Sequence, residues 1–148
     1  MLAHSIIIEV FIRPEEDIDA IRERFLTLIP FDLKEEKLEL KRKSAMGFNQ
    51  EKIVTLTIIL SKKRHIKQFL EDFVTKISEQ TKETMVQQID RRLDKEFYFY
   101  IRLDKSKLIT QGKLELTEDG DCIYVKIKIA VFPQKREKAI EEIENYLQ

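Results

Sequence analysis

Residues 96–103 read EFYFYIRL, and residues 122–131 read CIYVKIKIAV. In both stretches apolar side chains alternate with tyrosine or basic side chains, which is the two-residue period of a β-strand with one buried face. The apolar sets are Phe97, Phe99, Ile101 and Leu103 in the first stretch and Ile123, Val125, Ile127 and Ile129 in the second. We expect these sets to pack under helices, which leaves the tyrosine and basic side chains on the uncovered side.

The rest of the chain shows the same two kinds of pattern. Alternation predicts strands over residues 5–13, 37–43 and 53–60, and helical spacing predicts helices over residues 18–28, 62–77, 81–93 and 135–147, with a short helix in 104–111. Ser61 is the expected N-cap of the second helix. Asp119-Gly120 lies between two alternating runs, which predicts a hairpin of residues 113–117 with 122–131. The pattern indicates an α+β two-layer sandwich, with a largely antiparallel sheet and helices on one face.

The two halves of the chain share a predicted order of strand–helix–strand–strand–helix. The sequence Lys37-Leu38-Glu39-Leu40 recurs as Lys113-Leu114-Glu115-Leu116. This likeness suggests an internal duplication, although the same tetrapeptide is also common in half-exposed strands of unrelated origin. Because no linker rich in Gly, Ser or Pro divides the halves, we expect one domain over residues 1–148.

Composition excludes several classes of protein. The 27 Lys+Arg and 27 Asp+Glu give a formal net charge of zero, and 43% of the 148 residues are hydrophobic, which excludes intrinsic disorder. No apolar run approaches the roughly 20 residues that cross a bilayer. The single cysteine, Cys122, excludes a disulfide framework and a multi-cysteine zinc site. Residues 1–8 have no export pattern, so we expect a cytoplasmic protein with no membrane contact and no bound metal.

Residues suited to catalysis are sparse. The two histidines have no neighbour that marks either as a base, and His65 is expected to be solvated within a basic stretch. A weaker alternative is a magnesium-dependent nuclease that uses Asp90, Asp94 and Asp104. The first two of these flank a pair of arginines, however, so ion pairing on a helix also explains them. We expect a protein that is not an enzyme.

The uncovered side of the two quoted strands is the first candidate for function. It carries Tyr98, Tyr100 and Arg102 on one strand and Tyr124, Lys126 and Lys128 on the other. Single-stranded RNA is commonly bound this way, because bases stack on aromatic rings while Lys and Arg hold phosphates. The same side of the other strands carries apolar Ile7, Phe11, Ile53 and Ile59. A protein-interaction module that pairs with itself, as a homodimer, or with a larger complex is therefore the alternative.

A basic run is the second candidate. From residue 41 to residue 67 there are eight basic side chains against Glu51 alone. Lys41, Arg42 and Lys43 are expected at the loop end of a hairpin formed by residues 37–43 and 53–60, where they would assist RNA binding. The alternative is that these side chains belong to ordinary solvated strand ends and helix faces.

Several short motifs in the second half recur together. They are Arg92-Leu93-Asp94, Arg102-Leu103-Asp104-Lys105, Gly112-Lys113-Leu114-Glu115-Leu116 and Asp121-Cys122-Ile123-Tyr124-Val125. With these motifs, residues 90–129 resemble a small archaeal family described as RNA-binding and predicted to be exosome-associated. Residues 132–137 are also similar, and residues 45–49 match more loosely because the family favours a second glycine there. Gly112 is expected to occupy a backbone position with positive φ.

The resemblance implies a fold like that of the large-subunit ribosomal protein that binds 5S rRNA. It implies RNA as the partner, single-stranded or structured, with no catalysis and no cofactor, and an association with exosome or ribosome-related proteins in archaeal RNA processing or degradation. Carried over by position, it implies RNA contacts from Arg92, Arg102 and Lys105, with Asp94 and Asp104 orienting the arginines. We therefore expect a non-catalytic RNA-binding protein.

Overall fold

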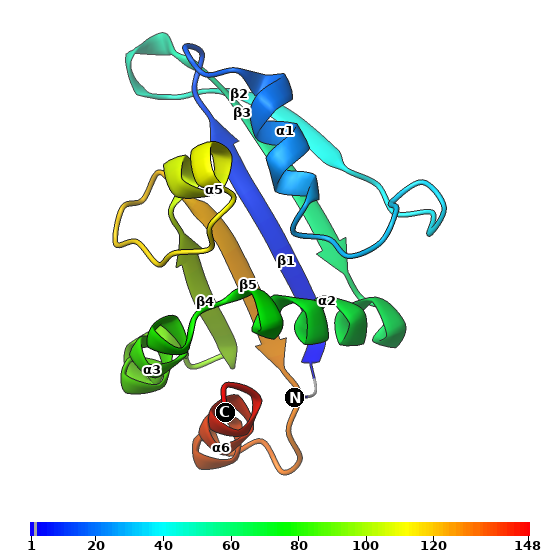
Figure 1. Ribbon diagram of the computed structural model, residues 1–148, viewed down its shortest axis with the longest axis vertical. Coiled ribbons are helices and arrows are strands. Elements are labelled where there is room, and N and C mark those ends of the chain that lie inside the picture. Colours follow the sequence, from blue (N-terminus) through cyan, green and yellow to red (C-terminus); the bar gives the residue numbers. More distant parts are fainter. Residues whose placement is uncertain (2) are drawn as a thin grey trace.

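Five strands form one antiparallel sheet in the computed structural model, which describes Met1 and residues 3–148 (Figure 1). They are β1 (Ala3–Ile12), β2 (Lys41–Met46), β3 (Lys52–Leu60), β4 (Tyr98–Leu103) and β5 (Ile123–Ile129). Their spatial order is β2-β3-β1-β5-β4. The long strand β1 pairs with β3 on one side and with β5 on the other, so the central strand joins the two halves of the chain.

The helices cover one side of this sheet. They are α1 (Ile18–Leu26), α2 (Lys63–Lys76), α3 (Glu79–Gln87), α4 (Ile89–Arg92), α5 (Lys105–Gln111) and α6 (Arg136–Tyr146), with a short 3-10 turn η1 (Phe48–Gln50). In Figure 1, α2 crosses in front of the strands, α1 lies in front of the sheet and runs roughly along them, and α3 and α6 lie at the lower end of the sheet. None of the helices in Met1 and residues 3–148 has the length and apolar character that crossing a bilayer requires. The expected two-layer α+β sandwich is confirmed.

Side chains and one glycine set several helix ends. Asp17 caps α1 by accepting from the backbone N–H groups of Asp19 and Ala20, and Ser78 caps α3. The expected cap of α2 is wrong: its N-cap is Lys62 rather than Ser61. Gly112 ends α5 with a φ of 67°, which confirms the predicted positive φ.

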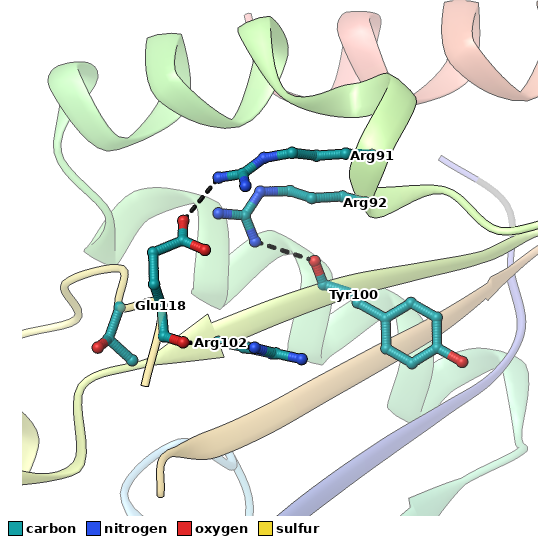
Figure 2. A pocket seen from close by; sticks show the side chains of 6 residues that line it. Arg91, Arg92, Tyr100, Arg102 and Glu118 are labelled. Atoms are coloured by element: carbon teal, nitrogen blue, oxygen red, sulfur yellow. Dashed lines mark hydrogen bonds and ion pairs between the residues drawn. The ribbon is translucent and has the colours of Figure 1, made fainter. Parts of the chain in front are cut away.

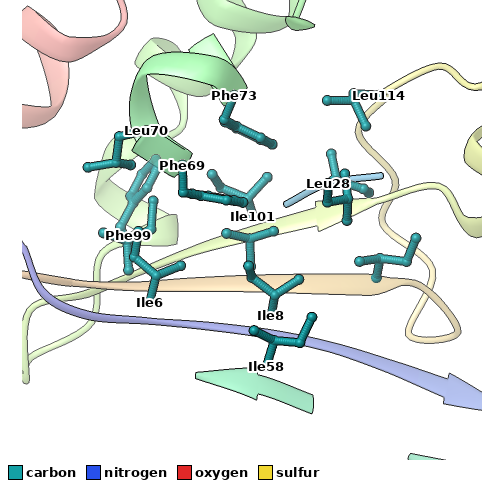
Figure 3. Close-up of a cluster of buried hydrophobic side chains, with 14 of the residues drawn as sticks. Ile6, Ile8, Leu28, Ile58, Phe69, Leu70, Phe73, Phe99, Ile101 and Leu114 are labelled. Carbon is teal, nitrogen blue, oxygen red and sulfur yellow. The ribbon is translucent and has the colours of Figure 1, made fainter. Parts of the chain in front are cut away.

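The core lies between the sheet and the helices. The alternation in β1 buries Ile6 and Ile8, and the alternation in β4 buries Ile101. From α2, Phe69 and Phe73 stack at 5.5 Å between ring centroids and lie above these strand residues (Figure 3). Full burial of such side chains contributes about 1.5–3 kcal/mol each. This packing fixes which side of each strand is left uncovered.

The predicted hairpin of residues 113–117 with the last strand is wrong. The neighbours of β5 are β1 and β4, and residues 115–117 instead lie beside the end of β4, at its outer edge. There Leu116 bridges Leu103, and the N–H of Thr117 donates to the carbonyl of Arg102. Pairing with two long strands buries more of β5 than one short hairpin would. The second half of the chain therefore has one strand fewer than the first, so the predicted repeat of strand–helix–strand–strand–helix does not hold.

The predicted strand over residues 37–43 is displaced along the chain. Lys37 has a φ of 56°, a left-handed conformation that interrupts an extended run, and β2 begins only at Lys41. The partners of β2 are Lys41 with Thr57 and Met46 with Lys52, so the loop end of the hairpin lies at Met46. The basic residues 41–43 are therefore in the far half of β2 and not at the loop end.

We predict that Phe69→Ala lowers the free energy of unfolding by about 3–5 kcal/mol, because it leaves a cavity where a fully buried ring packed. Urea denaturation followed by circular dichroism measures the change. Phe132→Ala is the matched control, because that ring is 96% exposed, and it should change stability by less than about 0.5 kcal/mol. Equal losses in the two variants would contradict the packing described above.

Candidate nucleic-acid interface

The register of β4 and β5 places six predicted residues together. Tyr98 is opposite Lys128, Tyr100 is opposite Lys126, and Arg102 is opposite Tyr124. Opposed residues of an antiparallel pair point to the same side of the sheet. These six side chains, all partly exposed, therefore lie on the side away from the helices. We call them the open face: Tyr98, Tyr100, Arg102, Tyr124, Lys126 and Lys128.

Cations lie over the rings of the open face. The Lys128 ammonium is 4.6 Å from the ring centroid of Tyr98, and the Arg102 guanidinium carbon is 5.4 Å from that of Tyr124. Lys126 approaches the same Tyr124 ring at 5.7 Å. Such contacts contribute roughly 0.5–1 kcal/mol each at exposed sites. They keep a positive charge beside the rings of Tyr98 and Tyr124, the combination that a stacked base and its phosphate require.

Two of the tyrosine hydroxyls are already engaged. The hydroxyl of Tyr100 donates to Oδ2 of Asp94 at 3.1 Å, and that of Tyr124 donates to the carbonyl of Gly120 at 3.2 Å. Burial, together with the hydrogen bond to Asp94, raises the pKa of Tyr100, so its hydroxyl stays protonated. These bonds leave the rings as surfaces for stacking and commit the hydroxyls to the protein.

The two aspartates of the family motifs do not orient arginines. Oδ1 of Asp94 accepts from the backbone N–H groups of Glu96 and Tyr98, both at 2.9 Å, so Asp94 shapes the turn into β4. Asp104 caps α5 by accepting from the N–H of Lys107 at 2.9 Å. The expectation that these carboxylates orient arginines is wrong, since each is occupied by local main-chain donors.

Beyond β5 the open side becomes more apolar and less cationic. Glu9 of β1 stands opposite Tyr124 and accepts from the Thr57 hydroxyl at 3.0 Å. Phe11 extends the aromatic surface, because its ring packs edge-on against Tyr124 at 6.1 Å. Lys41 and Lys43 lie on the same side at the far edge of the sheet, where they are exposed. They are separated from β5 by the two strands β3 and β1.

Arg42 points the other way. It is paired with Leu56, which is buried in the core, so Arg42 belongs to the helix-covered side although the sheet edge leaves it exposed. The basic run at residues 41–43 is therefore divided between the two sides of β2. Its placement does not fit the expectation that all three residues contact RNA together.

Lys105 is buried, with 5% of its surface exposed. Its ammonium donates to the carbonyl of Phe11 at 3.0 Å, to Oε1 of Glu16 at 2.8 Å and to Oδ1 of Asp121 at 2.7 Å. These three bonds use all three ammonium protons. The expectation that Lys105 contacts RNA does not fit this placement. Its role is to tie β1, α5 and the segment before β5 together.

The carboxyl of Glu16 responds to this arrangement. Burial by itself raises the pKa of Glu16, but hydrogen bonds from Lys105 and from the N–H of Arg13, together with the two positive charges, outweigh it and hold that pKa below its usual value. The ionised form is therefore the one that the folded protein stabilises. This part of the stability is present above the usual pKa of glutamate and is lost as the pH falls.

Arg92 lies at the outer edge of β4 with 8% of its surface exposed. Its Nε and Nη2 donate to Oε1 of Gln88 at 3.0 and 2.6 Å, and its Nη1 donates to the carbonyl of Tyr100 at 3.2 Å. It lines a pocket of about 380 Å³ (Figure 2). We call this the arginine pocket, and its lining residues are Arg91, Arg92, Tyr100, Arg102, Thr117 and Glu118.

Arg91 and Glu118 were not among the predicted site residues. Nη2 of Arg91 and Oε1 of Glu118 are 2.6 Å apart. The two residues are 27 positions apart in the chain, and nothing local in the sequence links them. The expected pairing of the arginines with Asp90 and Asp94 is not found: Arg91 pairs with Glu118, and Arg92 donates to neutral oxygens.

Two further expectations fail on burial and on geometry. His65 is fully buried rather than solvated. Its ring stacks on Phe31 at 4.8 Å between centroids, and its Nε2 is 3.5 Å from a carboxylate oxygen of Glu36.

Asp94 is engaged in the turn before β4, and Asp104 is the N-cap of α5. Across Met1 and residues 3–148, no group of three or more His, Cys, Asp or Glu side chains is arranged to hold a metal ion. The carboxylates of the nuclease alternative do not form a cluster.

Comparison with known proteins identifies the family. A family model described as RNA binding matches residues 5–129. The chain belongs to this RNA-binding family. The RNA-binding protein PAB1135 from Pyrococcus abyssi is 28% identical over 146 residues, which are 99% of this chain and 94% of that protein.

Solved structures share the fold of this family member over its full length. Protein AF2318 from Archaeglobus fulgidus superposes with a TM-score of 0.86 at 28% identity and covers 98% of this chain and 99% of its own. Mth689, a DUF54 protein from Methanothermobacter thermautotrophicus, superposes with a TM-score of 0.79 at 28% identity and full coverage of both chains. The resemblance to an archaeal RNA-binding family is thus confirmed.

We predict that Lys105→Met lowers the free energy of unfolding by roughly 1–3 kcal/mol, because it removes the buried ammonium and its three hydrogen bonds, while the partly exposed Glu16 and Asp121 carboxylates keep Arg13 as a partner. Urea denaturation at a series of pH values measures this change. The difference from the unsubstituted protein should narrow as the pH falls below the usual value of 4.5 for Glu16, since protonation removes the charge that Lys105 neutralises. Lys107→Met, on the same helix but half-exposed, is the control; an equal cost in both variants would contradict the role given to Lys105.

Proposed function

We propose that this protein binds unpaired RNA on the open face without catalysing a reaction. The observation that carries the proposal is the register of β4 and β5, which sets three tyrosine rings and three cations side by side on an uncovered part of the sheet. Membership of an RNA-binding family supports it. We place this activity in the cytoplasm, where the protein would meet its RNA.

The chemistry of the open face suits stacking more than base-specific readout. Each base stacked on an aromatic ring contributes about 1–3 kcal/mol, and every base offers a ring face. Two of the tyrosine hydroxyls are bonded to the protein, so Tyr100 and Tyr124 recognise a base through the ring. Lys126 lies beside the Tyr124 ring and Lys128 beside the Tyr98 ring, where the phosphates of a strand lying across β4 and β5 would pass. We expect moderate affinity with little preference for sequence.

We predict that Tyr98→Ala and Tyr124→Ala each weaken the binding of a short single-stranded RNA by about 1–3 kcal/mol, because each removes a stacking surface. Fluorescence anisotropy with a labelled oligonucleotide measures the affinity, and circular dichroism checks that the variants fold. Tyr98→Phe should bind nearly as well as the unsubstituted protein, since the ring is retained. Phe132→Ala removes an exposed ring in the loop after β5 and is the matched control; a loss as large as that of Tyr98→Ala would contradict the site.

We also predict a defined salt dependence. With four or five phosphates held by the cations of the open face and by Lys41 and Lys43, log K should fall against log salt with a slope of about −3 for a single strand. Lys126→Gln should make this slope shallower by about 0.7, because one phosphate contact is lost. A titration series between low and moderate salt measures both slopes. A slope near zero would show that phosphates are not held there.

A specific observation favours a second candidate function. On the open side of β1 and β3, Ile59 is 38% exposed and pairs with Ile7, while Phe11 and Ile53 lie further along the same side, beyond the pair of Glu9 with Thr57. We propose this apolar half as the surface for a protein partner, either a second copy or an exosome- or ribosome-related protein of the kind that the family resemblance implies. Light scattering distinguishes the first case, because a stable dimer that buries Ile59 and also Tyr98 would leave the RNA no surface. Copurification with such complexes tests the second.

A further inference from the structure

We propose that the arginine pocket binds the phosphomonoester at one end of the bound RNA. This inference rests on the proposed function, because the pocket would hold one end of the RNA that is bound on the open face. It goes further in assigning a ligand of stated chemistry, a terminal phosphate carrying close to two negative charges, to a pocket formed by α4, β4 and the segment before β5.

The charges that line the pocket do not balance. Three guanidinium groups face one carboxylate, Glu118, which leaves a charge of about +2 at neutral pH. Arg92 is the most buried of the three, and the oxygens to which it donates, on Gln88 and Tyr100, are uncharged. A buried cation without an opposite charge is costly, so the site favours an anion. Burial, with repulsion from Arg91 and Arg102, lowers the pKa of Arg92.

The size of this charge distinguishes between phosphates. A phosphate within an RNA chain is a diester with one negative charge, whereas a terminal monoester carries about −1.5 to −2 near pH 7. The monoester therefore matches the excess charge in the arginine pocket. Arginine suits it further, because the planar guanidinium donates two parallel hydrogen bonds to phosphate oxygens. The pocket volume of about 380 Å³ lies within the range of small-molecule sites, roughly 300–1,000 Å³.

The pocket and the open face are continuous. Arg102 takes part in both, because it lies over the ring of Tyr124 and also donates toward the carbonyl of Glu118 at 3.5 Å. Tyr100 likewise contributes its carbonyl to the pocket and its ring to the open face. Figure 2 shows Arg91 and Arg92 extending from α4 toward Glu118 while the Tyr100 ring points away from them. An RNA strand stacked on Tyr98 and Tyr100 thus has its end beside the pocket.

Glu118 competes with the ligand for Arg91. Its side chain is 71% exposed. Within Met1 and residues 3–148, its one ion pair is with Arg91, at 2.6 Å. The hydrogen bond from Arg91 lowers the pKa of Glu118, so this carboxylate is ionised at neutral pH. An incoming phosphate must displace it or share the guanidinium with it. Removal of this negative charge should therefore strengthen phosphate binding.

The test compares one short RNA in three forms, with a 5′-phosphate, with a 3′-phosphate, or with hydroxyls at both ends. Fluorescence anisotropy measures the affinity of each form for the full-length protein. We expect one phosphorylated form to bind about five- to tenfold tighter than the unphosphorylated form, the gain typical of a charge-assisted contact. Arg91→Gln should abolish this preference and Glu118→Gln should increase it. Arg22→Gln, on α1 with its own carboxylate partner at 2.8 Å, should leave it unchanged.

The possible outcomes separate the terminal-phosphate site from RNA binding on the open face. Equal affinity for the three RNAs would overturn the terminal-phosphate site while leaving RNA binding on the open face intact. A preference that survives Arg91→Gln would also overturn it. A nucleoside monophosphate that competes as well as the phosphorylated RNA would show that the ligand is a free nucleotide and would overturn the assignment to an RNA end. If none of the three RNAs binds, the proposed function itself fails.

Discussion

The antiparallel pairing of β4 with β5 is the constraint on which the surface of this protein depends. Successive side chains of a strand alternate between the two sides, so burial of Phe99 and Ile101 under the helices forces Tyr98 and Tyr100 to the other side. A shift of register by one residue would bring the tyrosines into the core and expose the apolar set. The energy that holds the core together therefore also selects the side chains of the open face.

The outer edge of β4 explains why arginines gather beside that face. An edge strand presents unpaired main-chain groups, which proteins commonly cover or pair. Here the carbonyl of Tyr98 accepts from the N–H of Asp94, that of Tyr100 accepts from Arg92, and that of Arg102 accepts from the N–H of Thr117. Protection of this edge thus brings α4 and the segment of Thr117 together around Arg102, which creates the arginine pocket.

The parts of the fold that could be predicted are those set by the local spacing of apolar side chains. The alternation in residues 96–103 and 122–131 predicts both strands and their uncovered side, because burial of one side of a strand leaves a direct trace in the sequence. The largest failed prediction of the fold concerns which strands pair. Asp119-Gly120 is a strong local turn signal, yet β5 gains more by pairing with β1 and β4 than with the short segment before it.

The candidate site shows the same division. The six residues of the open face follow from period and register, whereas the roles of Lys105 and His65 depend on partners that are distant in the sequence, such as Glu16 and Glu36. A buried lysine that pairs with two partly exposed carboxylates looks in the sequence like any lysine on a polar helix. The ion pair of Arg91 with Glu118 is hidden for the same reason, because only the covered edge of β4 brings those two residues together.

Nuclear magnetic resonance with an isotope-labelled protein tests the central claim most directly. As a short single-stranded RNA is added, the backbone amide signals of β4, β5 and the adjacent part of β1 should shift. Signals from the outward surfaces of α1 and α2 should remain in place. Shifts confined to the helical side, or no shift of Tyr98, Tyr100 and Tyr124 under conditions where the RNA is bound, would contradict that claim.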